Sequence, residues 1–99
     1  MQIDRRQIEA SLSQKGFVED NQHHRYFYHE FRGKRTGAYT YTSHGSKFKT
    51  YGVELLKMMK SQLRLDTIGQ AADLFKCPMS EQQYLAILRQ KGFLKGEDC

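Results

Sequence analysis

The sequence has few of the features that mark secreted, membrane-bound or disordered proteins. It contains one proline and two cysteines among 99 residues, and 38% of its residues are hydrophobic. The chain begins with MQIDRRQIEA, which holds no apolar run typical of a signal peptide. No stretch approaches the roughly 18 apolar residues that span a bilayer. We therefore expect a single soluble, cytoplasmic domain over residues 1–99, with no membrane partner.

Signatures of metal, cofactor and covalent chemistry are also missing. Cys77 and Cys99 form no CxxC pair, so we expect two reduced thiols. The histidines are His23, His24, His29 and His44, and their spacing matches no standard zinc site. A Gly-rich phosphate loop, a nucleophile elbow and paired acids at a useful spacing are absent from the sequence. We expect no metal and no cofactor.

The positive charge is concentrated in one aromatic-rich segment. The formal net charge is +5, and residues 22–50 hold six Lys or Arg against Glu30 alone. All four histidines lie in the same segment. A local basic field attracts polyanions because binding releases their counterions, and RNA is the partner we expect. A solvated basic face without a partner is the alternative interpretation.

The first residues predict a helix over about 4–15. Asp4 can accept hydrogen bonds from the free backbone N–H groups at its start. Ile8 and Leu12 lie about one turn apart and form a buried stripe. Gly16 is a typical residue for the left-handed backbone that ends a helix.

Three stretches with strand character follow, at residues 17–20, 24–31 and 35–42. The second stretch alternates with a period of two. One of its faces carries Phe27 and Phe31, and the other carries His24, Tyr26 and Tyr28. The short link around Gly33 predicts a tight turn, so the last two strands should form an antiparallel hairpin.

Helical patterns fill the rest of the chain. They cover about 51–63, a short segment from Asp66 or Thr67 to Phe75, and about 80–91. The predicted class is α+β: an α-β-β-β-α domain, similar to double-stranded-RNA-binding domains, with a three-stranded antiparallel sheet and two C-terminal helices. Residues 1–63 would form the core, and 64–99 a helical extension.

Three short motifs in this order carry a resemblance to a known family. They are Lys15-Gly16-Phe17, the strand from His24 to His29, and His44-Gly45-x-Lys47 with Gly52 eight residues after His44. This set resembles the HicA-type toxins, which are mRNA interferases of bacterial toxin–antitoxin pairs. The resemblance covers about residues 5–63. It implies a metal-independent endoribonuclease whose partner is an antitoxin protein.

The resemblance places the catalytic histidine at His24 and an electrostatic partner at Lys47. In the family, Gly-Ser precedes this histidine, whereas Gln22-His23 stands here. Two interpretations stay open: His23 shares the catalytic role, or the domain binds RNA without cutting it. Imidazole suits a general base because its unperturbed pKa is about 6.5. His44 is expected to hold the turn before the second helix.

The remaining predicted RNA contacts are a set of cations and aromatic rings. Arg25 and Arg35 are candidates for phosphate, and Tyr26 and Tyr28 for unpaired bases. Tyrosines on neighbouring strands also pair across a sheet for stability, so that role stays open for them. A non-catalytic RNA-binding module and a homodimeric protein-interaction domain are the alternative functions.

Overall fold

The computed structural model of the chain describes residues 1–43, 49–76 and 78–94. The predicted phosphate contact Lys47, the predicted turn residue His44 and both cysteines lie outside these ranges. Within the described ranges, no helix is both long enough and apolar enough to cross a bilayer.

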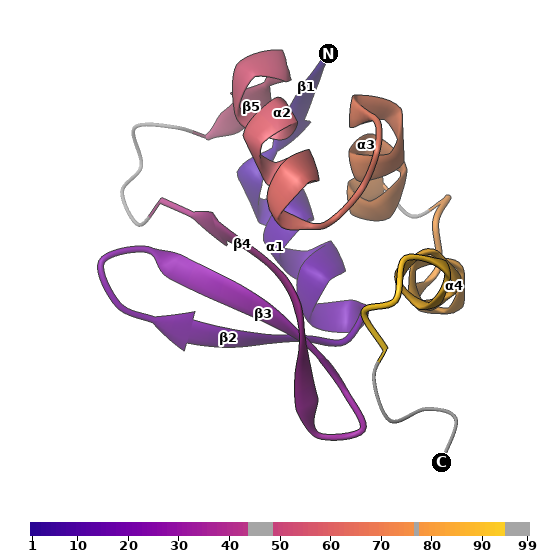
Figure 1. Cartoon of the computed structure of the whole chain (residues 1–99). Coiled ribbons are helices and arrows are strands. Elements are labelled where there is room, and N and C mark those ends of the chain that lie inside the picture. The colour runs from indigo at the N-terminus through magenta and orange to yellow at the C-terminus, as the bar shows by residue number, and fades with distance from the viewer. Residues whose placement is uncertain (44–48, 77, 95–99) are drawn as a thin grey trace.

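The described residues form an α+β structure with four helices and two antiparallel sheets (Figure 1). In chain order the elements are β1 (Gln2–Asp4), α1 (Arg5–Gln14), β2 (Phe17–Asn21), β3 (Arg25–Phe31), β4 (Lys34–Thr42), β5 (Thr50–Gly52), α2 (Val53–Gln62), α3 (Ile68–Lys76) and α4 (Glu81–Gln90). The larger sheet has the order β2-β3-β4, and β1 pairs with β5. The predicted class and the three-stranded antiparallel sheet are confirmed.

The first helix has the cap and the buried stripe that its sequence predicts. The side chain of Asp4 accepts a hydrogen bond from the backbone N–H of Arg6 at 3.1 Å. Ile8 and Leu12 are fully buried. Gly16 follows the helix with φ of +91°, a conformation that a residue with a Cβ rarely adopts.

The hairpin of β3 and β4 is also confirmed, and the predicted strand ends lie within one residue of those observed. Phe31 pairs with Lys34, and Arg32 and Gly33 between them have φ of 55° and 79°. Positive φ at both central residues is the backbone of a type I′ turn, whose twist matches that of the flanking strands. The register shifts between the pairs Tyr28–Tyr39 and Glu30–Arg35, where three residues of β4 lie opposite one residue of β3, so the irregularity is a bulge in β4.

The small sheet of β1 and β5 was not predicted. In it Ile3 lies opposite Tyr51, and both side chains are buried. Strands of three residues are too short to show a period of two in the sequence. Because β5 takes up the residues just before the second helix, α2 begins at Val53 and not at about residue 51.

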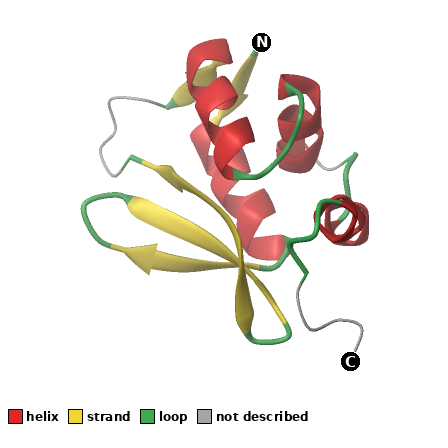
Figure 2. Cartoon of the chain, in the orientation of Figure 1, coloured by secondary structure: helices red, strands yellow, loops and turns green. Residues whose placement is uncertain are grey.

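The helices gather on one side of the three-stranded sheet (Figure 2). The third helix packs against α1 and α2. The hydroxyl of Ser11 donates a hydrogen bond to the carbonyl of Phe75 at 2.6 Å. The ammonium group of Lys15 donates another to the carbonyl of Leu74 at 2.5 Å. These bonds join the last turns of α1 to the end of α3.

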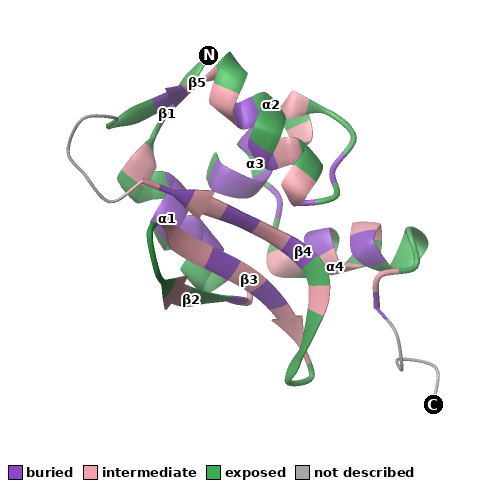
Figure 3. Ribbon diagram, turned by 60° about the vertical axis from the view of Figure 1, so that its left-hand side comes forward, coloured by how far each residue is buried: buried purple, intermediate pink, exposed green. Residues whose placement is uncertain are grey.

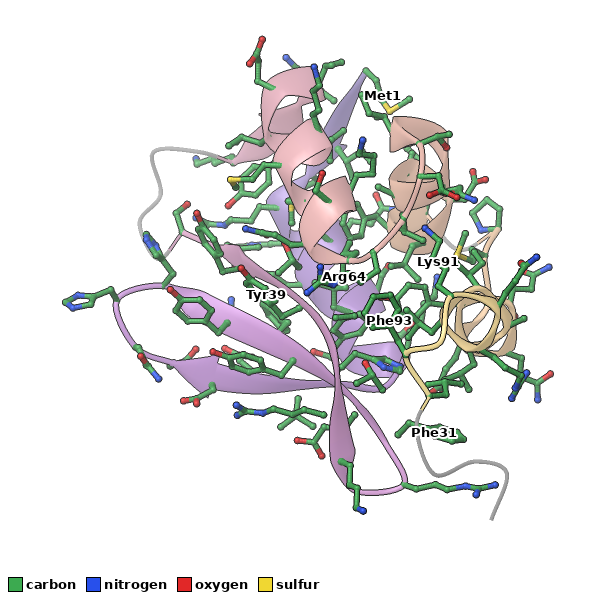
Figure 4. All side chains as sticks on the ribbon, viewed as in Figure 1. Met1, Phe31, Tyr39, Arg64, Lys91 and Phe93 are labelled. Carbon is green, nitrogen blue, oxygen red and sulfur yellow. The ribbon has the colours of Figure 1, made fainter. Side chains whose placement is uncertain are left out.

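The last helix closes the same core. Ser80 and Gln83 form a capping box at its start. The buried Tyr84 donates its hydroxyl to the carbonyl of Leu63 at 2.8 Å. Beyond the helix, the guanidinium of Arg64 lies 5.2 Å from the ring centroid of Phe93, and Figure 4 shows this pair between β4 and α4. The C-terminal helices therefore complete a hydrophobic core that residues 1–63 share.

We expect a chain of residues 1–63 to lack a stable fold. The truncation removes Phe75, Tyr84 and Leu88, which are fully buried. Loss of one large core side chain costs about 2–5 kcal/mol, against a total stability of about 5–15 kcal/mol. Thermal unfolding followed by circular dichroism tests this, with residues 1–94 as the control. A cooperative transition in the short chain would contradict it.

Candidate nucleic-acid interface

Four tyrosines form a continuous group on the sheet face that the helices leave uncovered. Tyr26 lies opposite Tyr41, and Tyr28 lies opposite Tyr39. The ring centroids of these pairs are 5.4 Å and 6.1 Å apart, and those of Tyr26 and Tyr28 are 5.9 Å apart. All four side chains are half-buried. We call this group the tyrosine face; Figure 4 labels Tyr39.

The alternation along β3 explains why these rings point outward. Phe27 and His29 point to the helices and are fully buried. The side chains between them must leave the sheet on its other face. Figure 3 shows buried and half-buried residues alternating along β3 and β4. The prediction that His24, Tyr26 and Tyr28 share a face is confirmed by their ring contacts.

His24 lies at one end of the tyrosine face, just before β3. Its ring stacks on Tyr41 with centroids 4.8 Å apart and planes inclined by 25°. The same ring packs edge-on against Tyr26, with the two centroids 6.2 Å apart. The residue is half-buried, whereas the neighbouring His23 is exposed. The predicted catalytic imidazole is thus within reach of solvent, in an aromatic setting.

Arg35 lies at the opposite end of the tyrosine face. Its guanidinium is 3.8 Å from the ring centroid of Tyr28, a distance at which a cation is attracted by the aromatic ring. It approaches the carboxylate of Asp20 at 3.9 Å, and its side chain is 57% exposed. This arginine keeps most of its surface in solvent, so an incoming phosphate can contact it.

Arg25 is held by two carboxylates. Its Nε and one terminal nitrogen donate to Glu19 at 2.7 Å and 3.0 Å, and the other donates to Glu9 at 2.7 Å. The hydrogen bonds to Glu19 are the largest of the effects that raise the pKa of Arg25. Glu9 is almost buried and also accepts from the hydroxyl of Thr42 at 2.6 Å. Arg25 therefore ties β3 to β2 and α1.

His29 is a core residue. Its Nδ1 lies 3.0 Å from the hydroxyl oxygen of Thr36. The oxygen of that hydroxyl also lies 3.4 Å from the carbonyl oxygen of His29. The imidazole packs edge-on against the rings of Phe17 and Tyr84, with centroid distances of 5.0 Å and 5.2 Å. Burial lowers the pKa of His29 to about 4, which keeps the imidazole neutral.

The structure contains a pocket beside His24 that the sequence did not predict. It has a volume of about 370 Å³, and its lining residues are His24, Tyr41, Ser43, Tyr51, Leu55 and Met58. These residues come from β4, β5 and α2 and from the segments before β3 and after β4. No periodicity joins positions so far apart in the chain, so only the fold brings them together. We call it the His24 pocket.

Comparison of the chain with protein-family models, with curated proteins and with solved structures found no match. The resemblance to HicA-type toxins therefore rests on the three short motifs alone. Among the described residues, no group of three or more His, Cys, Asp or Glu side chains is placed to hold a metal ion.

Acidification is expected to destabilise the fold through His29. Its pKa is about 4 in the folded protein and 6.5 without burial, so the unfolded chain binds the proton first as the pH falls. The associated stability is present above about pH 6.5 and is lost as the pH falls toward about 4, by on the order of 3 kcal/mol in all. Urea unfolding across this range measures the loss.

Two variants separate the effect of His29 from that of the other groups that bind protons as the pH falls. His29→Phe replaces the imidazole with a ring that cannot be protonated, so its free energy of unfolding should fall less steeply with pH than that of the wild type. His24→Gln also removes one histidine, the half-buried one at the end of the tyrosine face, and its slope is the comparison for that of His29→Phe. Equal slopes in the wild type and His29→Phe would show that His29 is not the group responsible.

Proposed function

We propose that the tyrosine face binds single-stranded RNA. The observation that carries this proposal is the row of four contiguous, half-buried rings on an uncovered sheet face. Unpaired bases stack on such rings, and each stacked base contributes about 1–3 kcal/mol. Arg35 and His24 lie at the two ends of the row and extend it with a cation and a further ring.

The charges support a strand that runs along this face. Six of the seven charged residues between 22 and 50 are basic. Arg25 is committed to Glu9 and Glu19, which leaves Arg35 as the better placed arginine for a phosphate. His23 is exposed next to His24 and can approach the same strand. Lys47 completes the proposed set of contacts.

The choice of RNA follows from the resemblance and from the order of the elements. The segment α1-β2-β3-β4-α2 has the helix–three strands–helix order of a double-stranded-RNA-binding-like core. The proposal therefore includes a double-stranded-RNA-binding-like fold for this segment. In this chain β1 and β5 add a second sheet to it, and α3 and α4 add two helices.

A second candidate is cleavage of the bound RNA by a HicA-like mechanism. It is favoured by the position of His24, which is half-buried on the same face as the proposed strand. The imidazole would take the proton of a ribose 2′-hydroxyl, whose oxygen then attacks the adjacent phosphorus to form a 2′,3′-cyclic phosphate. The bond from phosphorus to the 5′-oxygen breaks, and that oxygen takes a proton from water to become a 5′-hydroxyl. Lys47 would stabilise the charge on the phosphorane. An antitoxin protein would inhibit the reaction by covering this face.

Loss of one stacking ring should weaken RNA binding. We expect Tyr28→Ala and Tyr39→Ala each to lower the affinity for a short oligouridylate by about 5- to 150-fold, as loss of about 1–3 kcal/mol requires. Tyr39→Phe keeps the ring and should bind like the wild type. Fluorescence anisotropy of a labelled strand measures the affinity. Rings that serve only cross-strand pairing would leave it unchanged in folded alanine variants.

The arginine at the end of the face should contribute through a phosphate. We expect Arg35→Ala to lower the affinity for RNA. The slope of log affinity against log salt concentration should become shallower by about 1, the amount that one phosphate contact contributes. Arg89→Ala changes an exposed arginine on α4 and is the matched control. Equal salt slopes in the two variants would exclude Arg35 as a phosphate contact.

Cleavage is tested separately from binding. We expect the wild type to shorten mixed RNA in the presence of a chelator, leaving 2′,3′-cyclic phosphate and 5′-hydroxyl ends, and His24→Ala to be inactive while it still binds RNA. His23→Ala tells whether the preceding histidine shares the role. A wild type that binds RNA and never shortens it would reject the nuclease and retain the binding proposal.

A further inference from the structure

The His24 pocket has aromatic and aliphatic walls. The stacked rings of His24 and Tyr41 form one side, and Leu55 and Met58 of α2 contribute another. The hydroxyl of Tyr41 lies 3.7 Å from the sulfur of Met58, which joins these two sides. The volume of about 370 Å³ falls in the range of about 300–1,000 Å³ that is typical of small-molecule sites.

The polar side chains among the described lining residues carry hydroxyls and an imidazole. Tyr51 accepts a hydrogen bond from the backbone N–H of Ser43 at 3.0 Å, and the two hydroxyls lie 3.3 Å apart. Hydroxyls both donate and accept, as the edge of a base requires. Among the residues that the structure describes, no Asp, Glu, Lys or Arg lines the pocket. A neutral planar group suits the described lining, because its aromatic and aliphatic walls and its hydroxyls carry no formal charge.

The pocket is continuous with the tyrosine face. Tyr41 belongs to both, and His24 lines the pocket beside it; each of the two rings also contacts Tyr26 of the tyrosine face. A strand stacked on the tyrosines would therefore reach the mouth of the pocket with its next base. Stacking on an open face tolerates any base, whereas a pocket that offers hydroxyls to the edge of a base can distinguish one base from another.

We propose that the His24 pocket receives one unpaired base of the RNA strand that is bound on the tyrosine face. This inference rests on the proposed function, because it needs a strand on that face. The base would lie against the rings of His24 and Tyr41 and meet the hydroxyls of Ser43 and Tyr51 with its edge. The remaining bases stack on the open tyrosines, and the pocket supplies base preference at one position.

The test compares a short oligouridylate with derivatives that each lack one base. For the wild type, removal of the base that enters the pocket should lower the affinity by about 5- to 150-fold. Met58→Glu places a carboxylate in the pocket wall. It should cancel the loss at that position, so that the intact strand and this derivative bind alike, and leave the losses at the stacked positions unchanged.

The matched control is Val53→Glu. Val53 is exposed on the same helix and does not line the pocket. Both variants add one negative charge and repel RNA in general, so only the ratio of affinities for the intact and base-deleted strands reports on the pocket. Met58 is 37% exposed, so its replacement should leave the fold intact, and thermal unfolding verifies this.

A direct signal comes from the methionine methyl groups. Ring currents of an entering base should shift the Met58 methyl resonance when the intact strand binds, and much less when the base of the pocket is deleted. The methyl resonance of Met59, which is fully buried in the same helix, should keep its chemical shift. The exposed side chain of Met58 and the buried one of Met59 therefore form an internal comparison in one spectrum.

The outcomes distinguish the two proposals. RNA binding that needs Tyr28 and Tyr39, with no Met58 shift and equal ratios in Met58→Glu and Val53→Glu, would overturn the base pocket and leave the tyrosine face as the binding site. No binding of any strand by the wild type would overturn both. A Met58 shift together with a ratio altered in Met58→Glu alone would establish the pocket.

Discussion

The sidedness of β3 is the constraint on which the rest of the structure depends. Phe27 and His29 are fully buried against the helices, and Tyr26 and Tyr28 alternate with them. A slip of one residue would expose the phenylalanine and bury two tyrosine hydroxyls. The core therefore fixes which side chains face away from it. The tyrosine face is a consequence of packing on the opposite side of the same strand.

The last helix enforces this sidedness from far along the chain. Tyr84 packs against His29 and Phe17, which are themselves opposite each other on β3 and β2. Gly16 lies beside the same residues: a Cβ there would lie 3.3 Å from Nε2 of His29, and 2.5 Å from the carboxylate at the end of the Glu81 side chain of α4. The C-terminal helices thus form part of the structure that presents the tyrosines.

Ion pairs in the folded protein occupy part of the positive charge that the sequence concentrates between residues 22 and 50. Arg25 is one of the six basic residues between 22 and 50, yet it lies between Glu9 of α1 and Glu19 of β2. Both carboxylates come from outside that segment. A count along the chain includes this arginine, whereas the folded protein uses it to join three elements. Arg35 approaches the carboxylate of Asp20 at 3.9 Å and its side chain is 57% exposed, so its guanidinium is more accessible to a ligand than that of Arg25.

The sequence by itself determined the elements whose signals are local. The cap at Asp4, the alternation of β3 and the turn at Gly33 depend on neighbouring residues, and each is present as predicted. Tertiary structure alone decided the pairing of β1 with β5, the capture of Arg25 and the His24 pocket. Each joins residues far apart in the chain, and a one-dimensional pattern contains no distances between such residues.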